Sequence, residues 1–146
     1  MKRQAYMIIA LAVLLGSMAV AAQAQTSGRT QLVASIPFQF NVGDQAMPAG
    51  DYTITQVNPS SDLAVLQLRS KGGKCTAMIQ MNNVIGKGNE SARLVFNRYG
   101  SASYFAEAWT SDDTGLQAQK SKAERTARQE LAGMKPSSET VALKRR

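Results

Sequence analysis

Few side chains in this chain could do acid–base, nucleophilic or metal chemistry. Its 146 residues include 10 Asp and Glu, one Cys and no His. Histidine is the commonest general base and metal ligand. Because the chain has none, it cannot form a Ser-His-Asp triad, a Cys-His pair or a His-based zinc site. A hydrolase acting through carboxylates remains conceivable, with Asp51, Glu107, Asp112 and Asp113 as candidates. Acidic residues in turns, however, serve backbone hydrogen bonding far more often than catalysis, so we expect no enzyme, no cofactor and no metal.

Two short motifs have both a chemical and a structural interpretation. Asp112 and Asp113, in a Ser-Asp-Asp-Thr-Gly segment, could bind Ca²⁺ through oxygen atoms. They lack the alternating acidic ligands of a calcium loop, which favours a turn or helix-start role. Cys75 shares a period-two face with Ala77 and Ile79, which favours a small buried hydrophobe over a reactive thiol. As the only cysteine, it cannot form an intramolecular disulfide.

The positive charge of the chain is concentrated near its C-terminal end. The formal net charge is +7, yet residues 25–118 contain seven basic and seven acidic side chains. Residues 119–146 contain eight basic against three acidic side chains. A localised basic segment can attract an anionic surface, whereas a dispersed excess mainly aids solubility. We therefore expect anionic-surface contacts from Lys120, Lys122, Arg125, Arg128, Lys144, Arg145 and Arg146.

The first 24 residues have the layout of a bacterial secretory signal peptide. Lys2 and Arg3 precede an apolar run from Ala5 to Leu15, and an A-x-A cleavage motif ends the segment with Ala22 and Ala24. An uncleaved membrane anchor is the alternative, but its strongly apolar part is shorter than the roughly 20 residues that a spanning helix needs. We expect cleavage, no stable transmembrane anchor, and a periplasmic or secreted protein. Export also argues against a nucleic-acid partner.

The body of the chain, residues 25–118, has the pattern of an antiparallel β domain. Apolar residues recur at period two between Leu32 and Thr110, and turn residues separate the runs. Lys71-Gly72-Gly73-Lys74 predicts a hairpin, and Asn82 to Ser91 predicts a mobile loop. We expect a mainly β fold, a small antiparallel sandwich or partly open barrel of about six or seven strands. The strands are expected near residues 32–42, 52–57, 63–69, 75–81, 93–99 and 103–110.

The aromatic residues could form either a core or an exposed binding platform. A domain of this size needs its aromatic side chains inside, so core packing is the favoured interpretation. It applies to Tyr52, Tyr99, Tyr104, Phe105 and Trp109.

Residues 119–146 predict a basic helix followed by a disordered basic tail. Ser121 and Glu124 have the spacing of a capping box, in which each side chain satisfies a backbone N–H of the first helical turn. Strong helix formers follow, and Gly133 and Pro136 predict the end of the helix. The segment from Lys135 onward is polar and charged, which favours disorder.

Several motifs resemble a group of small exported β-rich proteins of environmental bacteria that have no assigned function. They are Ile36-Pro37-Phe38-x-Phe40-x-Val42-Gly43, Pro48-Ala49-Gly50-x-Tyr52, Leu94-Val95-Phe96-Asn97-Arg98-Tyr99-Gly100, Tyr104-Phe105 and Ser121-x-Ala123-Glu124-Arg125. Because these are strand and turn residues, the resemblance implies a fold and no catalytic or ligand-binding residue.

These observations favour an exported, non-enzymatic interaction or scaffold module. The β domain would be the scaffold, and the basic C-terminal arm would contact an anionic envelope component or an unknown protein. The alternative is a periplasmic carrier that holds a small ligand in an apolar cavity of the β domain.

Overall fold

The computed structural model describes residues 31–59, 61, 63–86, 91–110 and 113–146. The predicted signal peptide, with Ala22 and Ala24, lies outside the described residues, and so does Asp112. None of the helices in the described ranges is both long and apolar enough to cross a membrane.

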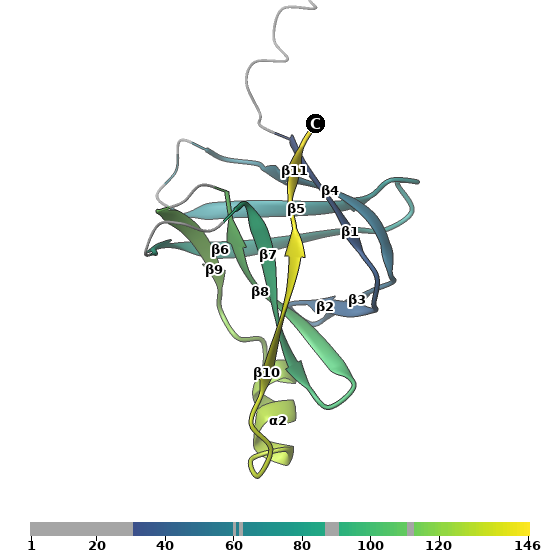
Figure 1. Ribbon diagram of the computed structural model, residues 1–146, viewed down its shortest axis with the longest axis vertical. Coiled ribbons are helices and arrows are strands. Elements are labelled where there is room, and N and C mark those ends of the chain that lie inside the picture. Colours follow the sequence, from purple (N-terminus) through teal and green to yellow (C-terminus); the bar gives the residue numbers. More distant parts are fainter. Residues whose placement is uncertain (1–30, 60, 62, 87–90, 111–112) are drawn as a thin grey trace, which may run out of the picture.

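The described part of the chain is mainly β, as predicted, and its strands join in a single open sheet (Figure 1). There are eleven strands rather than six or seven, because short elements form where the sequence pattern predicts continuous strands, loops or disorder. The strands are β1 (Gln31–Ile36), β2 (Phe40–Val42), β3 (Gln45–Met47), β4 (Gly50–Gln56), β5 (Ala64–Ser70), β6 (Thr76–Ile85), β7 (Arg93–Tyr99), β8 (Ala102–Trp109), β9 (Thr114–Ala118), β10 (Ser137–Ala142) and β11 (Lys144–Arg145).

The strand path runs β10-β7-β8-β9-β6-β5-β4-β1-β11, and each neighbouring pair on it is antiparallel. The predicted first strand is divided at Pro37, which cannot donate a ladder hydrogen bond, so β2 leaves the path and pairs with β3 and β8. Gly43, at φ 62°, makes the turn between β2 and β3. The predicted Gly-Gly hairpin is confirmed, with Gly73 at φ 70° between β5 and β6.

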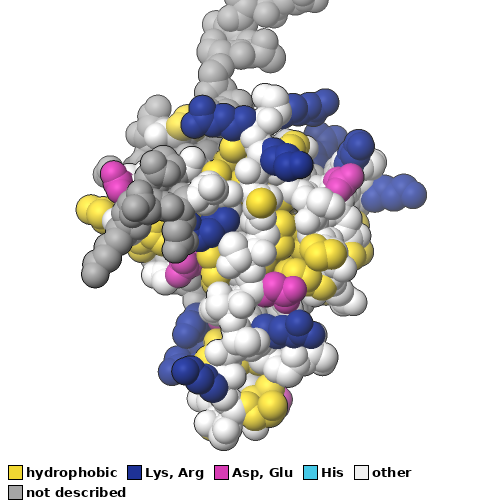
Figure 2. All heavy atoms as spheres, viewed as in Figure 1, with side chains coloured by type: hydrophobic (Ala, Val, Ile, Leu, Met, Phe, Trp, Pro, Cys, Tyr) yellow, Lys and Arg dark blue, Asp and Glu magenta, His cyan; other side chains and the backbone are white. Residues whose placement is uncertain are grey.

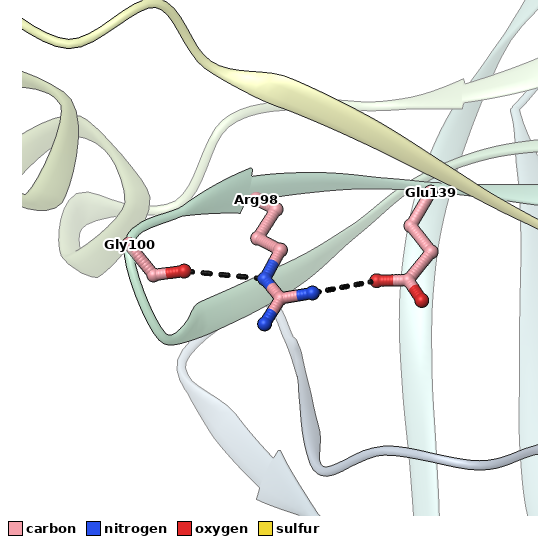
Figure 3. Close-up of polar contacts among 3 residues, drawn as sticks. All are labelled: Arg98, Gly100 and Glu139. Carbon is pink, nitrogen blue, oxygen red and sulfur yellow. Dashed lines mark hydrogen bonds and ion pairs between the residues drawn. The ribbon is translucent and has the colours of Figure 1, made fainter.

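The C-terminal segment is part of the sheet, and the prediction of a disordered tail is wrong. β10 pairs with β7 over six residues, and β11 pairs with β1, with Leu143 alone between the two strands. The segment thereby occupies both ends of the strand path and satisfies backbone groups that would otherwise be open edges. Leu143 is only 8% exposed, so this short anchor supplies the apolar burial that the composition did not suggest. Arg98 adds a contact from β7: its Nε donates to the Gly100 carbonyl at 3.2 Å, and its Nη1 lies 3.4 Å from Glu139 Oε2 (Figure 3).

The core consists largely of alternate residues, as the period-two pattern predicts, although β8 buries four consecutive residues, Ser103 to Ala106. It includes an aromatic cluster. The ring centroid of Phe40 lies 5.3 Å from those of Tyr52 and Phe96, and Phe96 lies 5.7 Å from Phe105. All four rings are at most 2% exposed, and their edge-to-face geometry is favourable. The prediction that the aromatic residues are internal is thus confirmed for four of the five, Tyr52, Tyr99, Tyr104 and Phe105, while Trp109 is half-buried. Cys75 is also half-buried and packs against this core.

The predicted loop of residues 82–91 begins later than expected, because β6 continues to Ile85. Residues 82–85 pair with β9, a strand that the sequence pattern missed. Gly115, predicted to be a turn residue, lies within β9 under the ring of Trp109, where an added Cβ would be 2.5 Å from Trp109 Cε3. A Cβ on Gly86 would be 2.4 Å from the same ring. These glycines are therefore required by close packing, while residues 87–90 lie outside the described ranges.

Helix α2 (Lys122–Glu130) begins where the capping motif predicts it. Ser121 Oγ accepts a hydrogen bond from the Glu124 backbone N–H at 3.1 Å. The Glu124 side chain, however, does not complete the reciprocal capping box, because its Oε1 accepts hydrogen bonds from two residues of the sheet. Asp44 Oδ1 also accepts from the Ala123 N–H at 3.2 Å, so contacts from β7 and from the turn after β2 fix the start of the helix.

Candidate anion-binding face

The predicted basic arm is divided into two groups by the fold. Lys122, Arg125 and Arg128 lie on α2 and Lys120 just before it, at one end of the molecule. Lys144 and Arg145 lie in β11, with Arg146 next to it, at the other end (Figure 1). The seven residues consequently cannot act as one continuous contact surface.

Pairing of β11 with β1 places the C-terminal residues on the same face of the sheet as two further basic residues, Arg69 and Lys71. Lys144 lies opposite Val33, and the Arg146 N–H donates to the Gln31 carbonyl at 3.2 Å. On the far side of β4, Arg69 lies opposite Thr53. Lys71 follows β5 and donates its backbone N–H to the Asp51 carbonyl at 2.9 Å.

We call this surface of β11, β1, β4 and β5 the cationic face, defined by Arg69, Lys71, Lys144 and Arg146. The alternation of β5 indicates that Arg69 points away from the core, because Ala64, Leu66 and Leu68 on the other side of the strand are buried. No sequence signal places β5 near β11. Arg145, by contrast, pairs with Leu32 and does not line the hollows of this face.

The cationic face is hollowed rather than flat. One hollow of about 580 Å³ lies between β10–β11 and the outer side of β1 and β4, and a second of about 400 Å³ continues it toward the β5–β6 hairpin. Both are lined by Thr53, Lys71 and Arg146. Lys144 lines the first and Arg69 the second. The two hollows therefore form one continuous depression bordered by four cationic side chains.

The electrostatics of this depression favour an anion. All four cationic side chains are exposed, and Asp51 is the one acidic residue among those that line it. In the part of the chain that the structure describes, no ion pair links these four side chains to a carboxylate. Figure 2 shows Lys and Arg side chains gathered at the end of the molecule where β11 lies. Four positive charges with one carboxylate among them leave a net positive potential, which raises the local concentration of anions.

Between the charged sides lies a strip of neutral polar side chains, which we call the polar floor. It consists of Gln31 and Ser35 on β1, Thr53 and Thr55 on β4, and Gln67 on β5. Gln31 and Ser35 are exposed, and the other three are half-buried. Within the described ranges, no hydrogen bond from the protein engages these five side chains. Their hydroxyl and amide groups are therefore available to a ligand.

A second polar cluster lies where α2 meets the sheet, and its geometry indicates a structural role. Glu124, 4% exposed, accepts hydrogen bonds at Oε1 from Asn97 Nδ2 at 2.9 Å and from the Tyr99 hydroxyl at 3.2 Å. Burial, followed by the nearby Glu124 carboxylate, raises the pKa of Tyr99 above its usual value. The Tyr99 hydroxyl thus keeps its proton and remains a donor, and the cluster anchors the helix.

The remaining chemical candidates of the sequence have structural partners or lie outside the described ranges. The Asp113 carbonyl accepts from the Gly86 N–H at 2.9 Å, which extends the pairing of β6 with β9 by one residue. Trp109 Nε1 donates to Glu107 Oε2 at 2.8 Å. No group of three or more His, Cys, Asp or Glu suited to a metal occurs among the residues that the structure describes.

Comparisons of the chain with protein families, with curated proteins and with solved structures give no match.

Proposed function

We propose that the protein is an exported, non-enzymatic interaction module that binds an anionic component of the cell envelope through its cationic face. The observation that carries this proposal is the convergence of Arg69 and Lys71 with Lys144 and Arg146 around one depression, although they are far apart in sequence. Four exposed cationic groups around one hollow, with one carboxylate among them, attract an anion to it. Export is proposed from the signal-peptide pattern of residues 1–24.

The observations favour this surface over the small-ligand carrier. A carrier would hold its ligand between the strands, where Phe40, Tyr52, Phe96 and Phe105 pack at most 2% exposed. The polar groups of the cationic face, in contrast, are open to solvent and without protein partners in the described residues. A bound apolar molecule found by native mass spectrometry of the purified protein would support the carrier instead.

The test compares two variants with the same change in net charge. In the face variant, Arg69, Lys71, Lys144 and Arg146 are each replaced by Gln. In the control variant, Lys120, Lys122, Arg125 and Arg128 are each replaced by Gln, which removes four charges near α2. Point substitutions are preferable to truncation, because deleting the C-terminal segment would remove β10 and β11 from the sheet.

Binding is measured by sedimentation with phosphatidylglycerol vesicles and by fluorescence anisotropy with labelled polygalacturonate, at several salt concentrations. We expect the wild type and the control variant to bind at least one probe, and the face variant to lose most of that binding. Binding should also weaken with salt, since exposed charges are screened beyond about 8 Å at physiological ionic strength. Equal losses in both variants would show that net charge alone matters, and would overturn the assignment to the cationic face.

A further inference from the structure

The strand register arranges the cationic face as a neutral strip between two charged sides. One row crosses four strands, from Lys144 through Val33 and Thr53 to Arg69. Since neighbouring strands lie roughly 4.8 Å apart, the backbones that carry Lys144 and Arg69 are about 14 Å apart. The next row runs from Arg146 through Gln31 and Thr55 to Gln67. The positive charges therefore border the depression, and its centre presents hydroxyl and amide groups together with the side chain of Val33.

This arrangement suits a ligand that carries both negative charges and many hydroxyl groups. The polar floor offers donors and acceptors that no group of the described protein engages, and it extends over the three neighbouring strands β1, β4 and β5. A flat bilayer surface would meet the four long cationic side chains but would not reach the half-buried Thr53 and Thr55. A narrow chain of sugar units can enter the depression and form hydrogen bonds with the floor while its anionic groups contact the charged sides.

Single-stranded nucleic acid fits the face less well, because its recognition depends on aromatic side chains that stack on bases. Tyr52 is the aromatic residue among those that line the depression, and it is only 2% exposed. Its hydroxyl donates to the Pro48 carbonyl at 2.6 Å, so neither its ring nor its hydroxyl is open to a ligand.

We infer that the ligand of the cationic face is an acidic polysaccharide, bound as an extended chain along the polar floor between Lys144–Arg146 and Arg69–Lys71. This inference rests on the proposed function and makes it specific: the charges attract and retain the polymer, and the floor distinguishes a hydroxyl-bearing polyanion from others.

The test changes the floor without changing its charge. Thr53→Val combined with Thr55→Val removes two hydroxyls and keeps β-branched side chains that suit a strand. Thr140→Val is the matched control, because Thr140 is an exposed strand threonine that lines neither hollow. Far-ultraviolet circular dichroism and urea unfolding establish that each variant is folded. The probes are polygalacturonate, inorganic polyphosphate and phosphatidylglycerol vesicles.

We expect the double floor variant to bind polygalacturonate about tenfold more weakly, as the loss of two modest hydrogen bonds implies, and to bind polyphosphate unchanged. Thr140→Val should bind both as the wild type does. If the floor variant binds polygalacturonate like the wild type, or if vesicles or polyphosphate bind more tightly than polygalacturonate, the polysaccharide inference is wrong while the anion-binding function stands. If the four-charge face variant also binds every probe as the wild type does, both are wrong.

Discussion

Replacing Glu124 by Ala tests whether a buried polar cluster, rather than an apolar stripe, holds α2 on the sheet. The side chain is 4% exposed and accepts hydrogen bonds from Asn97 and Tyr99. Ala123, Ala127 and Leu131 form an apolar stripe at helical spacing, yet Ala123 is exposed and the other two are only half-buried. Loss of the carboxylate should therefore weaken the attachment of the whole helix.

The magnitude follows from the donors that the substitution leaves without partners. An unsatisfied buried donor costs about 1–3 kcal/mol. Tyr99 is 5% exposed and would bear this cost, whereas Asn97 is half-buried and can turn toward water. We expect the free energy of unfolding to fall by about 2 kcal/mol, which is about a 30-fold change in the unfolding equilibrium. Glu124→Gln should lose less, because its amide oxygen can accept both hydrogen bonds.

Urea denaturation measures the global effect, and limited trypsin digestion measures the local one, since Arg125 and Arg128 lie on α2. We expect faster cleavage at these two residues in Glu124→Ala than in the wild type. Glu130→Ala is the matched control, because it removes an exposed carboxyl group from the same helix. If Glu124→Ala and Glu130→Ala have the same stability and the same cleavage rate, Glu124 does not anchor the helix.

Two further predictions concern the tyrosines and the packing of Trp109. Burial raises the pKa of Tyr52, Tyr99 and Tyr104 above 10.0, so the folded state holds these protons more tightly than the unfolded state. Their contribution to stability is complete below pH 10.0 and is lost as the pH rises through the raised values. Urea unfolding below and above that pH should show a smaller alkaline loss in Tyr99→Phe than in the wild type, and an identical loss would contradict the assignment. Gly115→Ala places a Cβ 2.5 Å from the Trp109 ring and should lower the free energy of unfolding by about 1–3 kcal/mol. Gly72→Ala has open space and should change it by much less, so equal urea midpoints for the two variants would refute the packing argument.

Local patterns predicted the elements whose residues carry their own structural signal. Residues 93–99 form β7 with the expected bounds, and residues 93–97 alternate in burial. Ser121 caps the predicted helix. The predictions were wrong for segments that are stabilised by pairing with strands distant in the sequence. Residues 137–145 are too polar to predict as strands, but the edges of β7 and β1 give them backbone hydrogen bonds.

The sequence predicted two of the four residues that define the cationic face. Charge counting selected Lys144 and Arg146, because they belong to the segment with the excess of basic residues. It also selected Lys120 and Lys122, which the fold places at the opposite end of the molecule. Arg69 was not selected, because the segment around it is formally neutral and its relation to β11 depends on the sheet order.

The sequence by itself determined the alternation that buries one side of strands such as β1 and β5, because side-chain direction in a strand depends only on residue parity. It also determined where the helix begins and where positive charge accumulates. Tertiary structure alone decided which charges share a face. The pairings of β5 with β4, of β4 with β1 and of β1 with β11 connect residues near position 70 to residues near position 145. The candidate site is a product of strand order, and strand order arises from pairings between segments that no local pattern specifies.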